Sequence, residues 1–126
     1  MQIIITGHGH FASGMMSALA LIAGENAQIC AIDFDGADDG SRLATALKKQ
    51  SNMTPTLILT DLYGGTPFRQ AALMAMQDSN IRVVAGANLG MVLELAMKIA
   101  HAKTLDSMLD NLVEVGRENI VIFNHQ

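Results

Sequence analysis

The stretch TLILTDLYGGTPF, residues 56–68, decides the fold of this chain. Its first five residues are apolar or β-branched and follow Pro55, a pattern typical of a short strand that is covered on both faces. Its later residues pass through two glycines to Thr66 and Pro67. Because Thr66 suits the N-cap and Pro67 suits the first helical position, the stretch predicts a strand that leads through a tight loop into a helix.

The same alternation of strand and helix extends in both directions from this unit. Apolar, β-branched runs predict further strands, and apolar residues at helical spacing predict helices. The strands are expected over residues 3–6, 28–34 and 81–85, and the helices over 11–23, from 40 or 41 onward, over 66–76, over 89–100 with Asn88 as its cap, and from 104 or 105 to 115. This order predicts an α/β fold in one domain, residues 1–126. We expect a small doubly wound, mostly parallel sheet in the common order 2-1-3-4, with helices on both faces.

A last apolar run, NIVIF at residues 119–123, predicts a short C-terminal strand. Two predicted helices precede it without a strand between them, so it has no obvious parallel position in the sheet. Since an exposed strand edge needs a partner, we predict an antiparallel strand at a sheet edge or one exchanged between the subunits of a homodimer.

The composition excludes several classes of function. Half of the 126 residues are hydrophobic and only 16% are charged, which predicts a packed core rather than disorder. The net charge is −4 and no Lys/Arg cluster is present, so neither nucleic acid nor an anionic membrane is an expected partner. The single cysteine, the lack of signal-peptide features and the lack of a long apolar stretch predict a soluble cytoplasmic protein without membrane insertion.

Two glycine-containing segments follow the first and third predicted strands. Gly7-His8-Gly9-His10 follows the first strand, and the segment that begins at Asp61 follows the third. The order 2-1-3-4 places these two strand ends side by side, at the point where the strand order reverses. We therefore expect His8 and Asp61 to meet there, beside the start of a helix.

This pairing suits phosphoryl transfer to a histidine. A neutral imidazole is a nucleophile, and a carboxylate that accepts the N–H of one ring nitrogen leaves a lone pair on the other. Gly9, Gly65 and Thr66 are the candidate phosphate-binding residues, because glycine lets backbone approach closely and N–H groups at a helix start suit phosphate. Two alternatives stay open at this point: the segments are plain turns, or His8, His10 and Asp61 hold the metal of a hydrolase. We expect neither a metal nor another cofactor.

Four segments resemble one family closely. They are GHGHFASGM (7–15), LTDLYGGTPFRQAA (59–72), AGANLGM (85–91) and VGRENI (115–120). Together they resemble the IIA domain of the mannose family of the bacterial phosphoenolpyruvate-dependent sugar phosphotransferase system, which includes mannose, fructose, sorbose and amino-sugar branches. The resemblance is colinear over essentially the whole chain, and the Asp-x-x-Gly-Gly-Thr-Pro-Phe segment is its most specific part.

The resemblance implies a doubly wound fold, a dimer and a set of partners. It implies that His8 accepts phosphate from the phosphocarrier protein HPr and passes it to a IIB component for sugar uptake, that Asp61 orients His8, and that Thr66 supplies the hydroxyl at the helix start. The chain departs from the family in two places. His10 is a second histidine beside the first, and Gly90 stands where a proline is frequent.

Other residues receive secondary assignments. His10, Tyr63 and Arg69 are candidate accessory residues of the site or of a docking surface. Asp33, at the end of the second strand, is expected to be solvated, with a part in shaping the cleft as the alternative. A phosphorylatable regulatory module of the same fold, of the dihydroxyacetone-kinase type or within a transcriptional regulator, is the alternative function.

Overall fold

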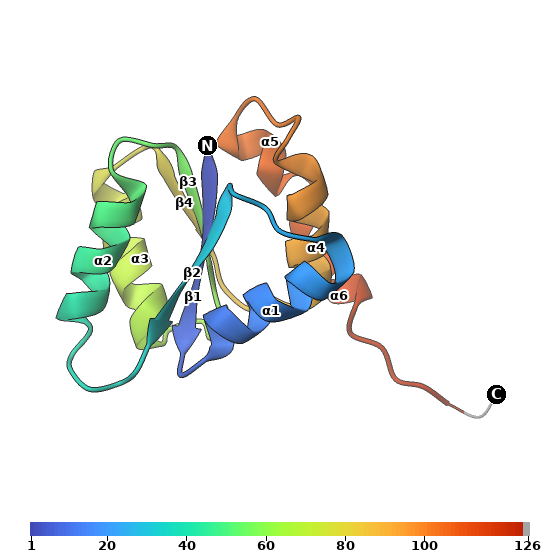
Figure 1. Ribbon diagram of the computed structural model, residues 1–126, viewed down its shortest axis with the longest axis horizontal. Helices are drawn as coiled ribbons and strands as arrows, with labels where there is room; N and C mark the ends of the chain where they lie inside the picture. The colour runs from blue at the N-terminus through green and yellow to red at the C-terminus, as the bar shows by residue number, and fades with distance from the viewer. Residues whose placement is uncertain (125–126) are drawn as a thin grey trace.

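The computed structural model describes residues 1–124 and arranges them in three layers (Figure 1). The middle layer is a sheet of four strands: β1 (Gln2–His8), β2 (Ile29–Phe34), β3 (Thr56–Thr60) and β4 (Ile81–Val84). The strand order is β2-β1-β3-β4 and every neighbouring pair is parallel. The predicted α/β fold and its strand order are therefore confirmed.

Helices cover both faces of this sheet, as Figure 1 shows. They are α1 (Phe11–Ala23), α2 (Ser41–Ser51), α3 (Thr66–Gln77), α4 (Leu89–Lys98), α5 (Leu105–Leu109) and α6 (Leu112–Glu118). The helices α2 and α3 lie against one face, and α1 and α4 lie against the other, with α5 and α6 beside α4. In this part of the chain, no helix is both long enough and apolar enough to cross a bilayer.

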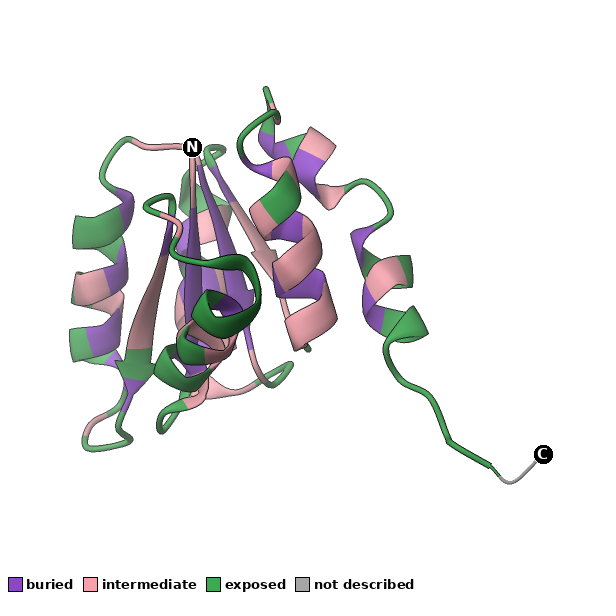
Figure 2. Ribbon diagram, turned by 45° about the vertical axis from the view of Figure 1, so that its right-hand side comes forward, coloured by how far each residue is buried: buried purple, intermediate pink, exposed green. Residues whose placement is uncertain are grey.

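Alternate residues of the central strands feed two separate cores. Ile3 and Ile5 of β1 pack with α1 and α4, whereas Ile4 packs with α2 and α3. Burial on both faces explains why these strands are apolar runs rather than alternating ones, and Figure 2 shows them buried behind helices with exposed outer surfaces. Since successive side chains alternate, Thr6 and His8 share the face of Ile4, the face that α2 and α3 cover.

Two predicted helix boundaries were wrong. The helix expected from 104 or 105 to 115 is two helices, because Asn111 adopts a left-handed conformation (φ 61°) and interrupts it. The N-cap of α3 is Gly65 rather than Thr66, so Thr66 stands inside the first turn next to Pro67. Asn88 does cap α4 as expected, because its side chain accepts a hydrogen bond from the N–H of Met91.

The C-terminal strand predicted over residues 119–123 is absent from the structure of the single chain. Asn119 is the C-cap of α6, and residues 120–124 leave the body of the molecule without regular structure (Figure 1). Ile120, Val121, Ile122 and Phe123 are 77%, 79%, 86% and 94% exposed. The antiparallel position at a sheet edge is therefore wrong for the single chain, whereas exchange within a dimer stays a prediction.

Candidate functional site

His8 and Asp61 meet at the carboxyl edge of the sheet, where β1 and β3 end side by side. His8 is the last residue of β1, and Asp61 directly follows β3. The Nδ1 atom of His8 lies 2.8 Å from Oδ2 of Asp61, and the same oxygen accepts the main-chain N–H of His8 at 2.9 Å. The other ring nitrogen, Nε2, is left without this partner. The geometry thus specifies which nitrogen is available for chemistry.

The His8–Asp61 pair is held at the surface with one side covered. The His8 side chain is 45% exposed and that of Asp61 is 15% exposed. The ring of Phe34, at the end of β2, meets the imidazole edge to face with centroids 5.9 Å apart. Burial alone raises the pKa of Asp61, but hydrogen bonds from the main chain and ring of His8 and from the Leu62 N–H outweigh it and hold that pKa below its ordinary value. The carboxylate is therefore ionised at neutral pH and orients a histidine that solvent and partners can reach.

Two glycines make room for this pair. A Cβ at Gly7 would lie 2.9 Å from Cγ of Asp61 and 2.6 Å from the ring of Phe11. A Cβ at Gly65 would lie 2.7 Å from Cε1 of His8 and 3.4 Å from its Nε2. Gly65 is a sequence-predicted site residue. Gly7 was not among the predicted site residues. Its position directly before His8, at the end of a strand, could have indicated that another group approaches the backbone closely there.

The three candidate phosphate-binding residues differ in whether their main-chain N–H groups are free to bind a phosphate. Gly9 has a left-handed φ of 58° and donates its N–H to the carbonyl of Phe34, and the Gly65 N–H is bound by the carbonyl of Leu62. These two main-chain donors are engaged within the fold. The N–H groups of Thr66 and Phe68, in the first turn of α3, have no hydrogen-bond partner among residues 1–124 and mark the open end of the helix.

A second histidine–aspartate pair lies at the start of α1. The Nδ1 atom of His10 is 3.3 Å from Oδ2 of Asp33, and His10 is almost fully exposed. Asp33 also accepts the N–H of Ser13 at 2.9 Å and its hydroxyl at 2.7 Å. It therefore caps the start of α1 from β2 while remaining exposed, so Asp33 is solvated as expected and has a capping role in addition. The sequence carried a signal for this role, because Asp33 lies next to the end of a strand, at the same edge of the sheet as His8.

This second pair also bears on the metal alternative. His10 is oriented by Asp33, whereas His8 is oriented by Asp61, so the three side chains proposed as ligands do not gather at one point. Among residues 1–124 no group of three or more His, Cys, Asp or Glu side chains is arranged to hold a metal ion.

Of the accessory candidates, Tyr63 lies on the loop after β3 and Arg69 lies on α3. The ring of Tyr63 packs edge to face on Phe68, with centroids 4.9 Å apart, and is largely exposed. Arg69 is exposed and its Nη2 donates to the hydroxyl of Thr66 at 3.3 Å. Both residues therefore border the site without touching the His8–Asp61 pair.

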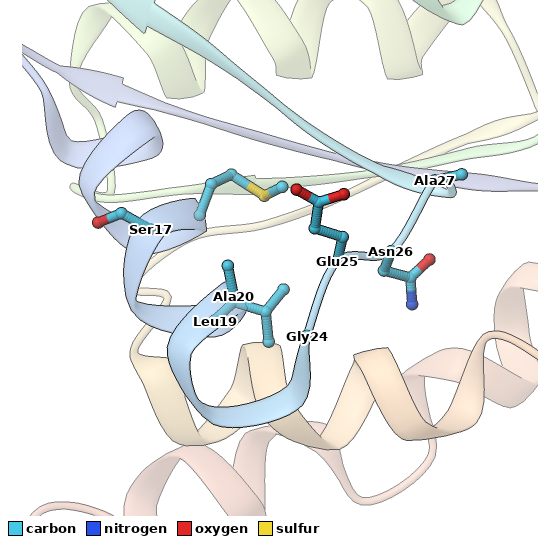
Figure 3. A pocket seen from close by; sticks show the side chains of 8 residues that line it. Ser17, Leu19, Ala20, Gly24, Glu25, Asn26 and Ala27 are labelled. Carbon is cyan, nitrogen blue, oxygen red and sulfur yellow. The ribbon is translucent and has the colours of Figure 1, made fainter.

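A hollow of about 610 Å³ lies away from this site, at the other end of α1. Figure 3 shows it beside the last two turns of α1 and the loop that leads to β2. Glu25 is the one charged residue in its lining. The hollow offers no histidine, cysteine or cationic group, so the site at the carboxyl edge remains the candidate.

Comparison with known proteins gives one consistent class, the IIA components of the sugar phosphotransferase system. The chain belongs to the family described as "PTS system fructose IIA component", whose model matches residues 2–113. The resemblance seen in the sequence is thereby confirmed.

The relatives carry different sugar names. The chain is 31% identical to the sorbose-specific EIIA component of Lacticaseibacillus casei, over 94% of this chain and 87% of that protein. It is 29% identical to the fructose-specific EIIA component of Bacillus subtilis, over 96% of this chain and 85% of that protein. The mannose-specific EIIAB component of Escherichia coli is 28% identical, and the chain corresponds to 38% of its length.

Solved structures agree with these relatives. The EIIA component from Streptococcus agalactiae superposes with a TM-score of 0.91 at 32% identity, covering 97% of this chain and 96% of that one. The mannose/sorbose-specific IIA subunit from Enterococcus faecalis superposes with a TM-score of 0.82 at 30% identity, covering 99% and 96%. A sigma-54 interaction domain protein from Enterococcus faecalis, at 16% identity and a TM-score of 0.77, shows the fold alone.

Proposed function

We propose that this chain is a phosphoryl carrier of the sugar phosphotransferase system that is phosphorylated on Nε2 of His8. The observation that carries the proposal is the 2.8 Å contact between His8 Nδ1 and the Asp61 carboxylate. It supports an imidazole with its proton on Nδ1 and its lone pair on Nε2. Membership of the IIA family supports the same reaction class, a phosphotransferase that forms a phosphohistidine intermediate.

The transfer exchanges one P–N bond for another. The lone pair of His8 Nε2 attacks the phosphorus of phospho-HPr, and the P–N bond of the donor histidine breaks, with its electron pair returning to the donor ring. His8 keeps the proton on Nδ1, so its ring becomes positively charged as the new bond forms. The ionised carboxylate of Asp61 stabilises that charge at hydrogen-bond distance. The reverse exchange then delivers the phosphoryl group to a histidine of a IIB component.

The remaining site residues position the phosphoryl group rather than react with it. The Thr66 and Phe68 N–H groups and the Thr66 hydroxyl lie at the start of α3, where partial positive charge favours an anion. Gly65 keeps this helix start against the imidazole because it has no side chain. Gly9 contributes indirectly, by turning the chain after His8. No metal or other cofactor takes part in these steps. The carrier works in the cytoplasm, where HPr and the IIB component are its partners.

The proposal is tested by phosphorylation with purified components. The protein is incubated with phosphoenolpyruvate, enzyme I and HPr, and the phosphorylated residue is identified by mass spectrometry at alkaline pH, where phosphohistidine persists. We expect phosphate on His8 alone. His8→Ala abolishes labelling and His10→Ala retains it. Labelling of the His8→Ala protein, or its loss from His10→Ala, would overturn the assignment.

A further inference from the structure

Arg69 is held over the end of α3 that faces His8. Its Nη2 atom donates to the Thr66 hydroxyl at 3.3 Å, which draws the guanidinium back toward the start of the helix. Gly65, the residue before Thr66, is the one whose Cα lies against the imidazole. The hydrogen bond therefore keeps the positive charge of Arg69 beside Thr66, at the end of α3 where Gly65 meets the imidazole.

This charge is not neutralised within the described part of the chain. The other three arginines each pair with a carboxylate: Arg42 with Asp38, Arg82 with Asp106 and Arg117 with Glu114. Among residues 1–124, no carboxylate lies within salt-bridge distance of Arg69. A guanidinium has five N–H donors, and the structure shows one side-chain hydrogen bond from Arg69. Arg69 thus has both charge and donors to offer a ligand.

The position of the phosphoryl group follows from the His8–Asp61 pair. Because Asp61 binds Nδ1, a phosphoryl group attached to His8 is carried on Nε2, and a Cβ at Gly65 would be 3.4 Å from that atom. The group then lies against the first turn of α3, next to Thr66. A phosphoryl group carries nearly two negative charges at neutral pH, and a guanidinium matches its oxygens well.

We propose that Arg69 binds a non-bridging oxygen of the phosphoryl group carried by His8, and that the Thr66 hydroxyl positions the guanidinium for it. The inference rests on the proposed function and adds a binding residue to it. Arg69 takes no proton and breaks no bond in the transfer. Its contact stabilises the phosphorylated form, which the His8–Asp61 pair alone leaves with an uncompensated dianion.

The first test uses phosphoramidate, a small donor that phosphorylates histidine without any partner protein. Comparison with His8→Ala, which lacks the signal, assigns the phosphorus NMR signal of phosphorylated His8. The chemical shift of this signal is then followed as a function of pH. A guanidinium on the phosphoryl oxygens favours their dianion, so we expect Arg69→Ala to move the titration to higher pH, by about half a unit. Arg69→Lys keeps part of the effect as a point charge, and the matched control Arg117→Ala leaves the titration unchanged.

The second test measures the equilibrium between phospho-HPr and the phosphorylated protein. We expect Arg69→Ala to lower the phosphorylated fraction at equilibrium, with an equilibrium constant reduced by about tenfold, as for the loss of one charge-assisted hydrogen bond. A change in KM for phospho-HPr with an unchanged equilibrium and an unchanged NMR titration would make Arg69 a docking residue and overturn the inference. A wild-type protein that phosphoramidate labels but phospho-HPr does not would contradict the proposed function instead.

Discussion

Asp61 accepts hydrogen bonds from three donors, and an asparagine at this position could not accept all three. Oδ2 accepts both the main-chain N–H and the ring of His8, and Oδ1 accepts the N–H of Leu62 at 2.8 Å. An asparagine has one oxygen, so its NH₂ group must face either His8 or Leu62. In the first orientation the ring loses the acceptor that holds its proton on Nδ1.

For Asp61→Asn we therefore predict a folded protein with phosphate uptake from phospho-HPr slowed by about ten- to a thousandfold. The rate falls because the favoured tautomer and the charge that stabilises the ring are both lost. Uptake is measured at a fixed donor concentration, with circular dichroism as the control for folding. A folded Asp61→Asn protein that takes up phosphate at the wild-type rate would show that the carboxylate does not orient His8.

Asp33 provides a pH-dependent prediction about stability. Burial raises its pKa, but hydrogen bonds from Ser13 and His10 lower it more, so the net shift is downward. A lowered pKa in the folded state means that the ionised group stabilises the fold above its unfolded pKa, near 4, and loses this effect as the pH falls through the folded value. We predict that Asp33→Ala costs about 1 kcal/mol at pH 7, the usual cost of losing an N-terminal cap.

The measurement is urea denaturation of both proteins between pH 7 and pH 3. The difference in unfolding free energy between wild type and Asp33→Ala is expected to be constant down to about pH 4 and to shrink below it. Asp35→Ala, a change in the same loop region outside this cap, is the control. A difference that stays constant to pH 3 would mean that the charge of Asp33 contributes nothing to the cap.

Single residues of the site were predictable to different degrees. His8, Asp61, Gly65 and Thr66 could be brought together from strand order alone, because parallel strand ends share one edge. The choice of Nε2 over Nδ1 could not, since it depends on where the carboxylate lies relative to the ring. The capping role of Asp33 was missed because the cap comes from β2, which follows α1 in the chain, rather than from the residue before the helix.

At the scale of elements, β1 and β3 share an unusual pair of buried hydroxyls. Thr6 and Thr60 are register partners in neighbouring strands, and both are fully buried. Neither Oγ1 atom has a hydrogen-bond partner among residues 1–124. A buried hydroxyl without a partner costs about 1–3 kcal/mol, and valine has nearly the same shape.

We therefore predict that the double substitution Thr6→Val, Thr60→Val raises the unfolding free energy by about 1 kcal/mol or more and leaves the fold intact. Thermal and urea unfolding of the double variant and of each single variant measure the change. A loss of stability would show that the two hydroxyls are satisfied in solution and act as a polar support beneath His8.

The contact between α4 and the C-terminal end of α6 gives a second prediction at this scale. The side chain of Asn119 occupies the space where a Cβ of Gly90 would lie, and its Nδ2 donates to the carbonyl of Val115 at 2.8 Å. Gly90→Ala is expected to displace Asn119 and to cost about 1–2 kcal/mol of stability by overpacking.

The same change should reverse its effect when the obstruction is removed. In an Asn119→Ala background, Gly90→Ala is expected to raise stability by about 0.5–1 kcal/mol, the usual gain when alanine replaces glycine within a helix. A double-mutant cycle by urea denaturation measures both values. Equal effects of Gly90→Ala in the two backgrounds would mean that Asn119 does not occupy that space in solution.

The elements themselves were largely predictable, with two exceptions that share a cause. Long periodic runs such as residues 11–23 and 56–60 defined their helix and strand well, since both burial and local preference favoured them. The break before α6 depends on the left-handed conformation of Asn111. Whether residues 119–123 form a strand depends on whether another strand is available to pair with them. Neither is encoded in local hydrophobic spacing.

At the scale of the whole molecule, residues 120–123 remain the most exposed apolar segment of the described chain. Four consecutive large apolar residues in water favour association through an unpaired strand. We predict a homodimer at micromolar concentration in which this segment pairs across subunits. Val121→Pro, which removes a main-chain donor, should give a monomer, whereas Val121→Ala should remain dimeric.

Light scattering with a concentration series measures this prediction. Hydrogen exchange of residues 120–123 provides the independent control, because pairing protects their amide groups in the dimer. A wild-type monomer with rapid exchange throughout the segment would contradict the exchanged strand.

The two hydrogen bonds from His8 to Asp61 also determine how the donor and acceptor proteins can reach the proposed carrier. One carboxylate oxygen binds both the ring and the main chain of the same residue, so the imidazole has no second orientation from which to present Nε2. Donor and acceptor proteins must then approach through the same opening and occupy it in turn. Turnover should follow ping-pong kinetics, and an excess of unphosphorylated acceptor should slow loading by competing with the donor for that opening. The flux of sugar uptake would thereby depend on the ratio of the two partners as well as on their amounts.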